Sequence, residues 1–209
     1  MKTSTLLFAG IVAAMFAIGA ANAGTFEDAV SAYERGDFRM AFQKFMPAAE
    51  EGNADAQVNV GAMYANGEGV QQNFEEALKW YRLSAEQGNA AAQNRLGSMY
   101  DDGIGVAQDF EEAAKWYRRS AEQGNIGAQI NIGAMHAKGV GVPQDFVLAH
   151  MWLTIAASRI PSDAREMRSF VTRLRDQVAV RMAPFQVEEA RQLARQWKPK
   201  TERQAVQVR

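Results

Sequence analysis

Few side chains in this 209-residue sequence could carry acid–base, nucleophilic or metal chemistry. It has no cysteine and only two histidines, His136 and His150, which excludes thiolate metal sites, cysteine nucleophiles and disulfides and makes a multi-histidine metal site improbable. No carboxylate close in sequence is placed to orient His136 as a general base. We expect His136 to be packed and hydrogen-bonded, and His150 to be partly exposed and inert.

Motifs of catalytic machinery are missing from the sequence as well. It contains no Ser-x-x-Lys, Gly-x-Ser-x-Gly or His-Glu-x-x-His. The Gly-x-Gly pairs, such as that at 67–69, lack a third glycine and follow expected helices, so they indicate turns. The paired carboxylates Glu75/Glu76 and Glu111/Glu112 fall at expected helix starts, where the helix dipole favours them. The sequence therefore predicts a protein that is not an enzyme, with no catalytic residue, metal or cofactor.

The elements that would position any site recur along the chain. Residues 54–89, 90–125 and the start of 126–161 align without a gap at a spacing of 36 residues, which is typical of a repeat array. Each block predicts two helices. Asparagine precedes the first helix, as at Asn53 and Asn89, and aspartate or asparagine precedes the second, as at Asp109; all are good N-caps.

Within each block, small and apolar residues follow the helical period. The first helix of the second block has Ala92, Leu96 and Tyr100 on one face, and its second helix buries Trp116. A glycine recurs one residue after the central apolar position, as at Gly97, which indicates that another helix approaches closely there.

These residues carry a resemblance to a known family. The pattern Ala-x3-Leu-Gly-x2-Tyr, Gly-x-Gly-Val and Asp-x3-Ala-x2-Trp-Tyr resembles Sel1-like repeats, which are relatives of tetratricopeptide repeats. The resemblance covers 54–158, and weakly 25–53, where the loop before the second helix is shorter. It implies an all-α, right-handed α-solenoid of stacked helix pairs whose first helices line a concave groove.

The sequence predicts five segments. They are a signal peptide at 1–23, a tetratricopeptide-like helix pair at 24–53, three repeats at 54–89, 90–125 and 126–158, capping helices at 159–197 and a disordered tail at 198–209. Lys2, the short apolar run after it and the cleavage site Ala21-Asn22-Ala23 favour export, with a periplasmic or secreted product. An uncleaved membrane anchor, and with it a membrane-bound regulatory subunit, is the alternative; after cleavage no stable membrane insertion is expected.

A candidate binding surface follows from the helical period. The side of each first helix opposite its apolar face differs from block to block while the scaffold positions repeat, as a peptide-reading groove requires. The predicted groove residues are Asn59, Ala62, Asn66, Arg95, Ser98, Asp102, Asn131, Ala134 and Lys138. The alternative is that they are ordinary solvent-exposed positions.

Two functions from different classes fit these features. The first is an exported adaptor that holds a partner protein or peptide in the groove. The second is a binder, with or without hydrolytic activity, of an envelope ligand such as a wall fragment or β-lactam-like compound.

The net charge of −1 gives no pull toward nucleic acid. Charge is distributed unevenly along the chain. Residues 24–158 have 18 acidic and 10 basic side chains, whereas residues 159–209 have 6 acidic and 12 basic side chains. The basic C-terminal end is either a solvated face or a site for an anionic partner. The oligomeric state is not fixed by the sequence.

Overall fold

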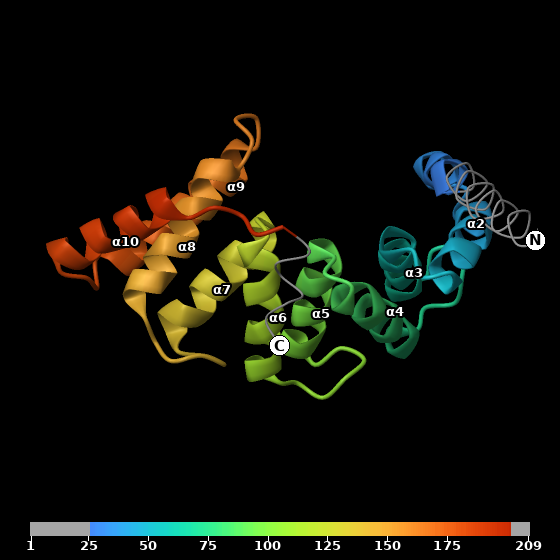
Figure 1. The fold of residues 1–209 in the computed structure, drawn as a ribbon, viewed down its shortest axis with the longest axis horizontal. Helices are drawn as coiled ribbons and strands as arrows, with labels where there is room; N and C mark the ends of the chain where they lie inside the picture. The colour runs from blue at the N-terminus through green and yellow to red at the C-terminus, as the bar shows by residue number, and fades with distance from the viewer. Residues whose placement is uncertain (1–25, 202–209) are drawn as a thin grey trace, which may run out of the picture. The chain divides into compact units, whose positions relative to one another are not determined.

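The computed structural model describes residues 26–201, and within that range the chain is helical with no strand (Figure 1). A helical stretch over 26–34 comes first. The helices after it are α2 (Phe38–Glu50), α3 (Ala54–Asn66), α4 (Phe74–Glu86), α5 (Ala90–Asp102), α6 (Phe110–Glu122), α7 (Ile126–Lys138), α8 (Phe146–Arg159), α9 (Arg165–Ala179) and α10 (Pro184–Gln196). The prediction of an all-α solenoid of helix pairs is confirmed.

The described residues form two compact units whose boundary lies inside α4, between Trp80 and Tyr81. In the first unit, α2 and α3 enclose a core of Ala41, Phe45, Val60 and Met63. In the second unit, α5 to α8 pack as two consecutive helix pairs, and α9 and α10 both pack on α8. Each unit thus has a core of its own.

Local capping explains why the helices begin and end where they do. The Asn89 side chain accepts a hydrogen bond from the backbone N–H of Ala92 at 3.1 Å, and Asn125 does the same for Ala128 at 3.0 Å. Gly103 ends α5 with φ +68° and Gly139 ends α7 with φ +71°, a left-handed conformation that favours glycine. The predicted first helices are confirmed.

The N-cap of α6 allows a direct test of the contribution of capping to stability. The Asp109 carboxylate accepts from the backbone N–H of Glu112 at 2.9 Å. Asp109→Ala is expected to lower the free energy of unfolding by about 1 kcal/mol, the usual cost of losing an N-cap. Urea unfolding followed by circular dichroism measures it, and Asp109→Asn should restore most of the loss, since asparagine caps equally well. A full loss in Asp109→Asn would contradict the capping role.

The recurrent helix glycine is a point of close approach, as predicted. A methyl group built on Gly97 of α5 would lie 2.8 Å from the Tyr117 ring of α6, and one on Gly133 of α7 would lie 3.1 Å from Leu153 of α8. The two helices of a pair are therefore in contact through the backbone of the first. A residue with a side chain at either position would hold the pair apart.

The loop after α7 reaches back to the preceding repeat. Gly141 has φ +66°, and a methyl group there would overlap the Phe110 carbonyl oxygen at the start of α6. This loop therefore ties the third repeat to the second by direct backbone contact, and only glycine meets both the conformational and the spatial requirement.

A pair of glutamines joins the two helices of the second repeat to each other and to the end of the first repeat. The Gln123 side-chain amide donates to the Gln93 side-chain oxygen and to the Gly88 carbonyl, both at 2.8 Å. In the third repeat the position of Gln123 is taken by Arg159, whose guanidinium lies 5.6 Å from the Trp197 ring centre of the terminal helix. Gln129, the counterpart of Gln93, is fully buried, and its side-chain oxygen has no partner there.

The C-terminal helices cover the end of the third repeat. α10 begins at Pro184, and Trp197 at its end packs edge-on against Trp152 at 6.2 Å between ring centres. The Lys200 ammonium group pairs with the Glu122 carboxylate at 2.8 Å. The Lys200 backbone N–H donates to the Glu122 carbonyl, also at 2.8 Å. The predicted disordered tail therefore does not begin at 198; residues 202–209 lie outside the described range.

One histidine prediction is wrong and the other holds. His150, expected to be partly exposed, is 2% exposed, because α9 and α10 both pack on α8. His136 is packed as predicted, with its Nδ1 atom 3.4 Å from the Pro143 carbonyl.

The predicted signal peptide, 1–23, lies outside the described residues. Among the residues that are described, none of the helices has the length and apolar character needed to cross a bilayer.

Candidate functional site

The predicted groove residues of the second unit lie on α5 and α7. On α5, Arg95 and Asp102 are exposed, and Ser98 is half-buried and donates to the Asp102 carboxylate at 3.2 Å. On α7, Lys138 is exposed, whereas Asn131 and Ala134 are half-buried. Each helix thus offers both exposed and half-buried positions.

The three groove residues of the first unit lie on α3 and are engaged locally. The Asn59 side chain donates to the Asp55 carbonyl of its own helix at 2.9 Å. Asn66 donates to Glu68 at 3.2 Å, and the Tyr33 hydroxyl donates to the other oxygen of the same carboxylate at 2.8 Å. The hydrogen bond to Glu68 raises the pKa of Tyr33, with burial adding to it. Ala62 is half-buried beside them.

Three of the predicted residues come together in one hollow of about 370 Å³ in the second unit. We call it the α5–α7 hollow. It is lined by Asp101, Phe110, Asn131, Ala134, Met135, Lys138 and Val140. The sequence argument identified Asn131, Ala134 and Lys138 and missed the other four.

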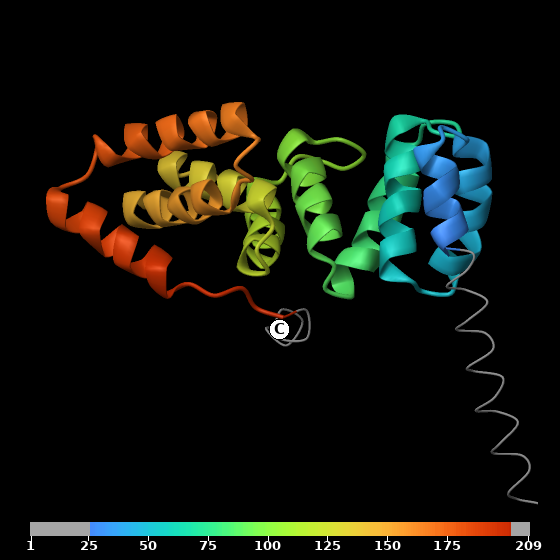
Figure 2. The same ribbon diagram turned by 90° about the horizontal axis from the view of Figure 1, so that it is seen from above.

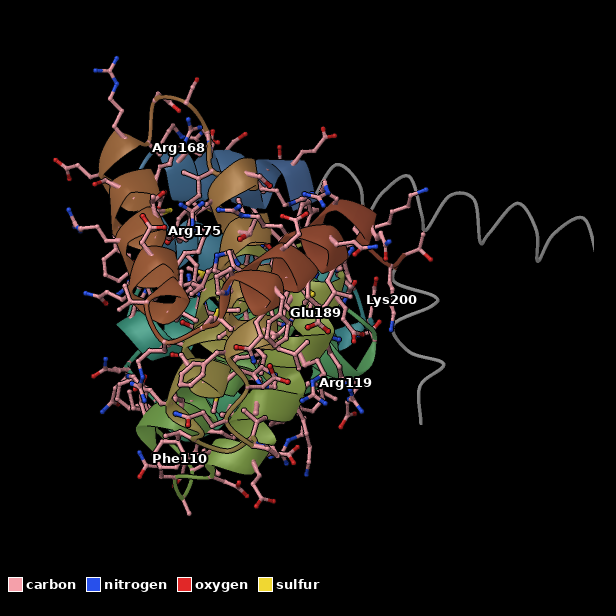
Figure 3. The ribbon with its side chains drawn as sticks, turned by 90° about the vertical axis from the view of Figure 1, so that its left-hand side faces the viewer. Phe110, Arg119, Arg168, Arg175, Glu189 and Lys200 are labelled. Carbon is pink, nitrogen blue, oxygen red and sulfur yellow. The ribbon has the colours of Figure 1, made fainter. Side chains whose placement is uncertain are left out.

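Capping and loop geometry place the residues that were missed. Phe110, labelled in Figure 3, is the first residue of α6, directly after its Asp109 cap. It is 38% exposed. Val140 follows the left-handed Gly139 that ends α7. Their apolar side chains, together with that of Met135, form an apolar wall of the hollow. An apolar side chain of a ligand would gain from leaving water at this wall.

The charged groups of the hollow lie on adjacent repeats. Asp101 is near the end of α5, and its carboxylate accepts from the Tyr117 hydroxyl at 3.4 Å. Burial raises the pKa of Asp101, and the nearby Asp102 carboxylate adds to the effect, while the Tyr117 hydroxyl and the Lys138 ammonium oppose it. Lys138 ends α7. The hollow therefore presents one acceptor and one cationic donor.

The remaining polar groups in and near the hollow are an amide and a buried histidine. Asn131 contributes a side-chain amide whose donor and acceptor match those of a peptide group. The His136 ring is buried, and burial lowers its pKa, partly offset by the Pro143 carbonyl. Across residues 26–201, no group of three histidine or carboxylate side chains is gathered that could hold a metal ion.

A signal for two of the missed residues is present in the sequence. Phe110 has phenylalanine counterparts at Phe74 and Phe146, directly after a cap residue, where the helical period does not demand an apolar side chain. Asp101 stands where the other repeats have Ala65 and Ala137. Of the two, only the Asp101 charge distinguishes the second repeat from the others, since the phenylalanine recurs in all three.

Comparison with known proteins gives the family. A family model described as Sel1 repeat matches residues 54–89, 90–125 and 126–159, just over half of the chain. A search of the curated proteins found no match.

Two solved structures are similar. A Sel1 repeat protein from Oxalobacter formigenes is 34% identical with a TM-score of 0.62, and the match covers 64% of this chain and 53% of that one. A protective antigen present in uropathogenic Escherichia coli strains, with an SLR fold, is 28% identical with a TM-score of 0.53, over 88% of this chain and 47% of that one. The chain thus spans about half the length of each. Its matched repeats and their helix pairs show that it belongs to the Sel1 repeat family.

Proposed function

We propose that this protein is an exported, non-catalytic adaptor that binds an extended segment of a partner protein on the face of its first helices, with the α5–α7 hollow as the anchoring point. Sel1 repeat proteins generally mediate protein–protein interaction and are generally non-catalytic. The observation that carries the proposal is the composition of the hollow, in which an apolar wall, an amide, a carboxylate and an ammonium group meet on adjacent repeats.

The hollow suggests how a segment would be held. An apolar side chain enters beside Phe110 and Met135, and the Asn131 amide pairs with the peptide group next to it. Lys138 and Asp101 then favour an acidic neighbour on one side and a basic neighbour on the other. A typical hydrogen bond contributes a net of about 0.5–1.5 kcal/mol, whereas burying a large apolar side chain contributes about 1.5–3 kcal/mol. The apolar anchor therefore supplies most of the affinity, and the polar groups supply the orientation.

Site-directed cross-linking tests the location. A photoreactive amino acid at Ala134 in the full-length chain, expressed in its own host, is expected to capture one defined protein, identified by mass spectrometry. The same amino acid at Ala107, an exposed loop position, is the control and is expected to capture it weakly or not at all. Equal capture at both positions would contradict binding in the hollow.

The captured protein then allows a quantitative test. The double variant Asn131→Ala/Lys138→Ala is expected to weaken its binding at least tenfold, about 1.4 kcal/mol, in calorimetric titration. Lys115→Ala also removes one positive charge, from an exposed pair with Glu112 on α6, and is expected to change the affinity less than twofold. Similar losses in both variants would mean that charge alone, and not the hollow, drives binding.

A further inference from the structure

The last three helices form a wedge. α9 and α10 diverge from the turn at 180–183, and α8 lies between them (Figure 2). Both helices pack on α8. His150, Thr154 and Ser158 follow one another on α8 at a spacing of four residues; His150 is buried, and Thr154 and Ser158 line a hollow together with residues of α10. The wedge therefore has a floor from α8 and two walls from later helices.

A second hollow, of about 400 Å³, opens along the α10 side of this floor. We call it the wedge hollow. It is lined by Thr154, Ile155, Ser158, Arg191, Ala194 and Arg195. Its volume lies in the usual range for ligand sites, about 300–1,000 Å³. Ile155 and Ala194 give it an apolar base, and two guanidinium groups stand at its rim; no carboxylate lines it.

The hydroxyl groups of the floor are already oriented. The Ser158 hydroxyl donates to the Ile155 carbonyl at 2.7 Å, so it is satisfied within its own helix. The Thr154 hydroxyl lies 3.3 Å from Nδ1 of the buried His150. The guanidinium groups are thus the principal donors available to a ligand.

Positive charge reaches the floor from both walls. Figure 3 places Arg168 and Arg175 of α9 on the side that faces α8. Arg168 donates to the Ile160 carbonyl of the α8 end at 2.6 Å. Burial lowers the pKa of His150, and the Arg175 and Arg191 charges lower it further, against an opposing effect of Asp176. His150 therefore lies in a positive field made by α9 and α10 together.

The acidic residues nearby offset only part of this positive charge, and Glu188 acts on both Arg195 and Arg191. Asp176 is paired with Arg175 at 2.7 Å, and Glu188 is paired with Arg195 at 2.8 Å. The Glu188–Arg195 pair is exposed, so a ligand carboxylate can take the place of Glu188 at little cost. Arg191 makes no ion pair within the part of the chain that the structure describes. Residues 159–201 carry ten arginine and lysine side chains against five aspartate and glutamate.

We propose that the wedge hollow is a second binding site, for a peptide segment in which a carboxylate adjoins an apolar side chain. The carboxylate binds the Arg191 guanidinium, joined by Arg195, in the planar geometry that arginine offers. The apolar side chain rests on Ile155 and Ala194. Charge complementarity selects the ligand, and the apolar base fixes its register. The site is separate from the α5–α7 hollow and does not depend on it.

The histidines supply a site-specific readout. The chain has only two, His150 beneath the wedge hollow and His136 in the core of the third repeat. The probes are the acetylated, amidated peptide of sequence ELEEL and its neutral counterpart QLQQL, titrated into the full-length chain. The acidic peptide is expected to shift the His150 imidazole resonances and leave those of His136 in place. The neutral peptide is expected to shift neither at the same concentration.

Variants locate the charge. Arg191→Gln is expected to weaken the binding of the acidic peptide at least tenfold. Arg173→Gln, on α9 in a separate depression with Arg165, Glu166 and Ser169, removes the same charge and is expected to change affinity less than twofold. Both positions are exposed, and unchanged His136 resonances verify that each variant is folded.

Four outcomes overturn the proposal. They are no His150 shift with the acidic peptide, equal binding of the neutral peptide, equal losses in the two variants, and a His150 shift produced by decanoate at concentrations where the peptide produces none. The last would assign the hollow to a lipid-like anion. None of these results bears on cross-linking at Ala134, so the adaptor proposal stands or falls separately.

Discussion

Replacing Trp116 with alanine is expected to lower the free energy of unfolding by about 3–5 kcal/mol, the range for a large buried aromatic side chain. The Trp116 side chain is 7% exposed, and the Arg119 guanidinium lies 4.8 Å from its ring centre. Its indole N–H is buried without a hydrogen-bond partner. The loss therefore comes from packing and from the contact with the Arg119 guanidinium, and no hydrogen bond is removed with the ring.

The measurement is urea unfolding followed by far-ultraviolet circular dichroism, because removing a tryptophan alters fluorescence directly. Phe110→Ala, an aromatic truncation on the same helix at a more exposed position, is the matched control, and its cost is expected to be about 1 kcal/mol. If Trp116→Ala cost no more than Phe110→Ala, the second helix of the repeat would not be the buried element described here.

Gly97→Leu is expected to give the second largest loss, about 1–3 kcal/mol or more, from overpacking. The new Cβ would lie 2.8 Å from the Tyr117 ring, which is itself buried. The Tyr117 ring cannot swing out freely, because it is packed in the core and its hydroxyl is bonded to Asp101. The helix pair must then separate or α6 must tilt.

The neighbouring Ser98→Ala is the control for Gly97→Leu. It removes the exposed hydrogen bond to Asp102 and the Ser98 hydrogen bond with the Tyr117 hydroxyl, without adding any atom between α5 and α6. Its cost is expected to stay below about 1.5 kcal/mol, the upper end for a hydrogen bond. Thermal unfolding of both variants gives the comparison. Equal losses would place Gly97 toward solvent and would remove the close approach of α5 and α6.

The repeat helices could be predicted from the sequence because their determinants are local. The asparagine caps, the left-handed glycines after α5 and α7, and the helix glycine at 97 each act within a few residues or one helix pair, and each is found as expected. The 36-residue repeat strengthens the prediction of each helix, because the same residue types return at the same spacing.

The environment of His150 could not be predicted in this way. In the second repeat the equivalent residue is Ala114, and the terminal helices that cover His150 have no counterpart earlier in the chain. A non-repeating cap changes the surroundings of a repeating position. The α5–α7 hollow was missed in part for a related reason, because its walls come from two repeats, whereas a helical period describes one helix at a time.

The glutamine pair has a consequence for how such an array can grow. Gln93 and Gln123 belong to one block, so a duplicate of 90–125 inserted in register would bring its own internal bridge. A duplicate of 126–161 would instead place a copy of Arg159 mid-array, away from Trp197, and would leave a second buried glutamine oxygen unsatisfied. An inserted copy of 90–125 is therefore expected to be tolerated better than an inserted copy of 126–161, because the third repeat packs directly against the C-terminal helices.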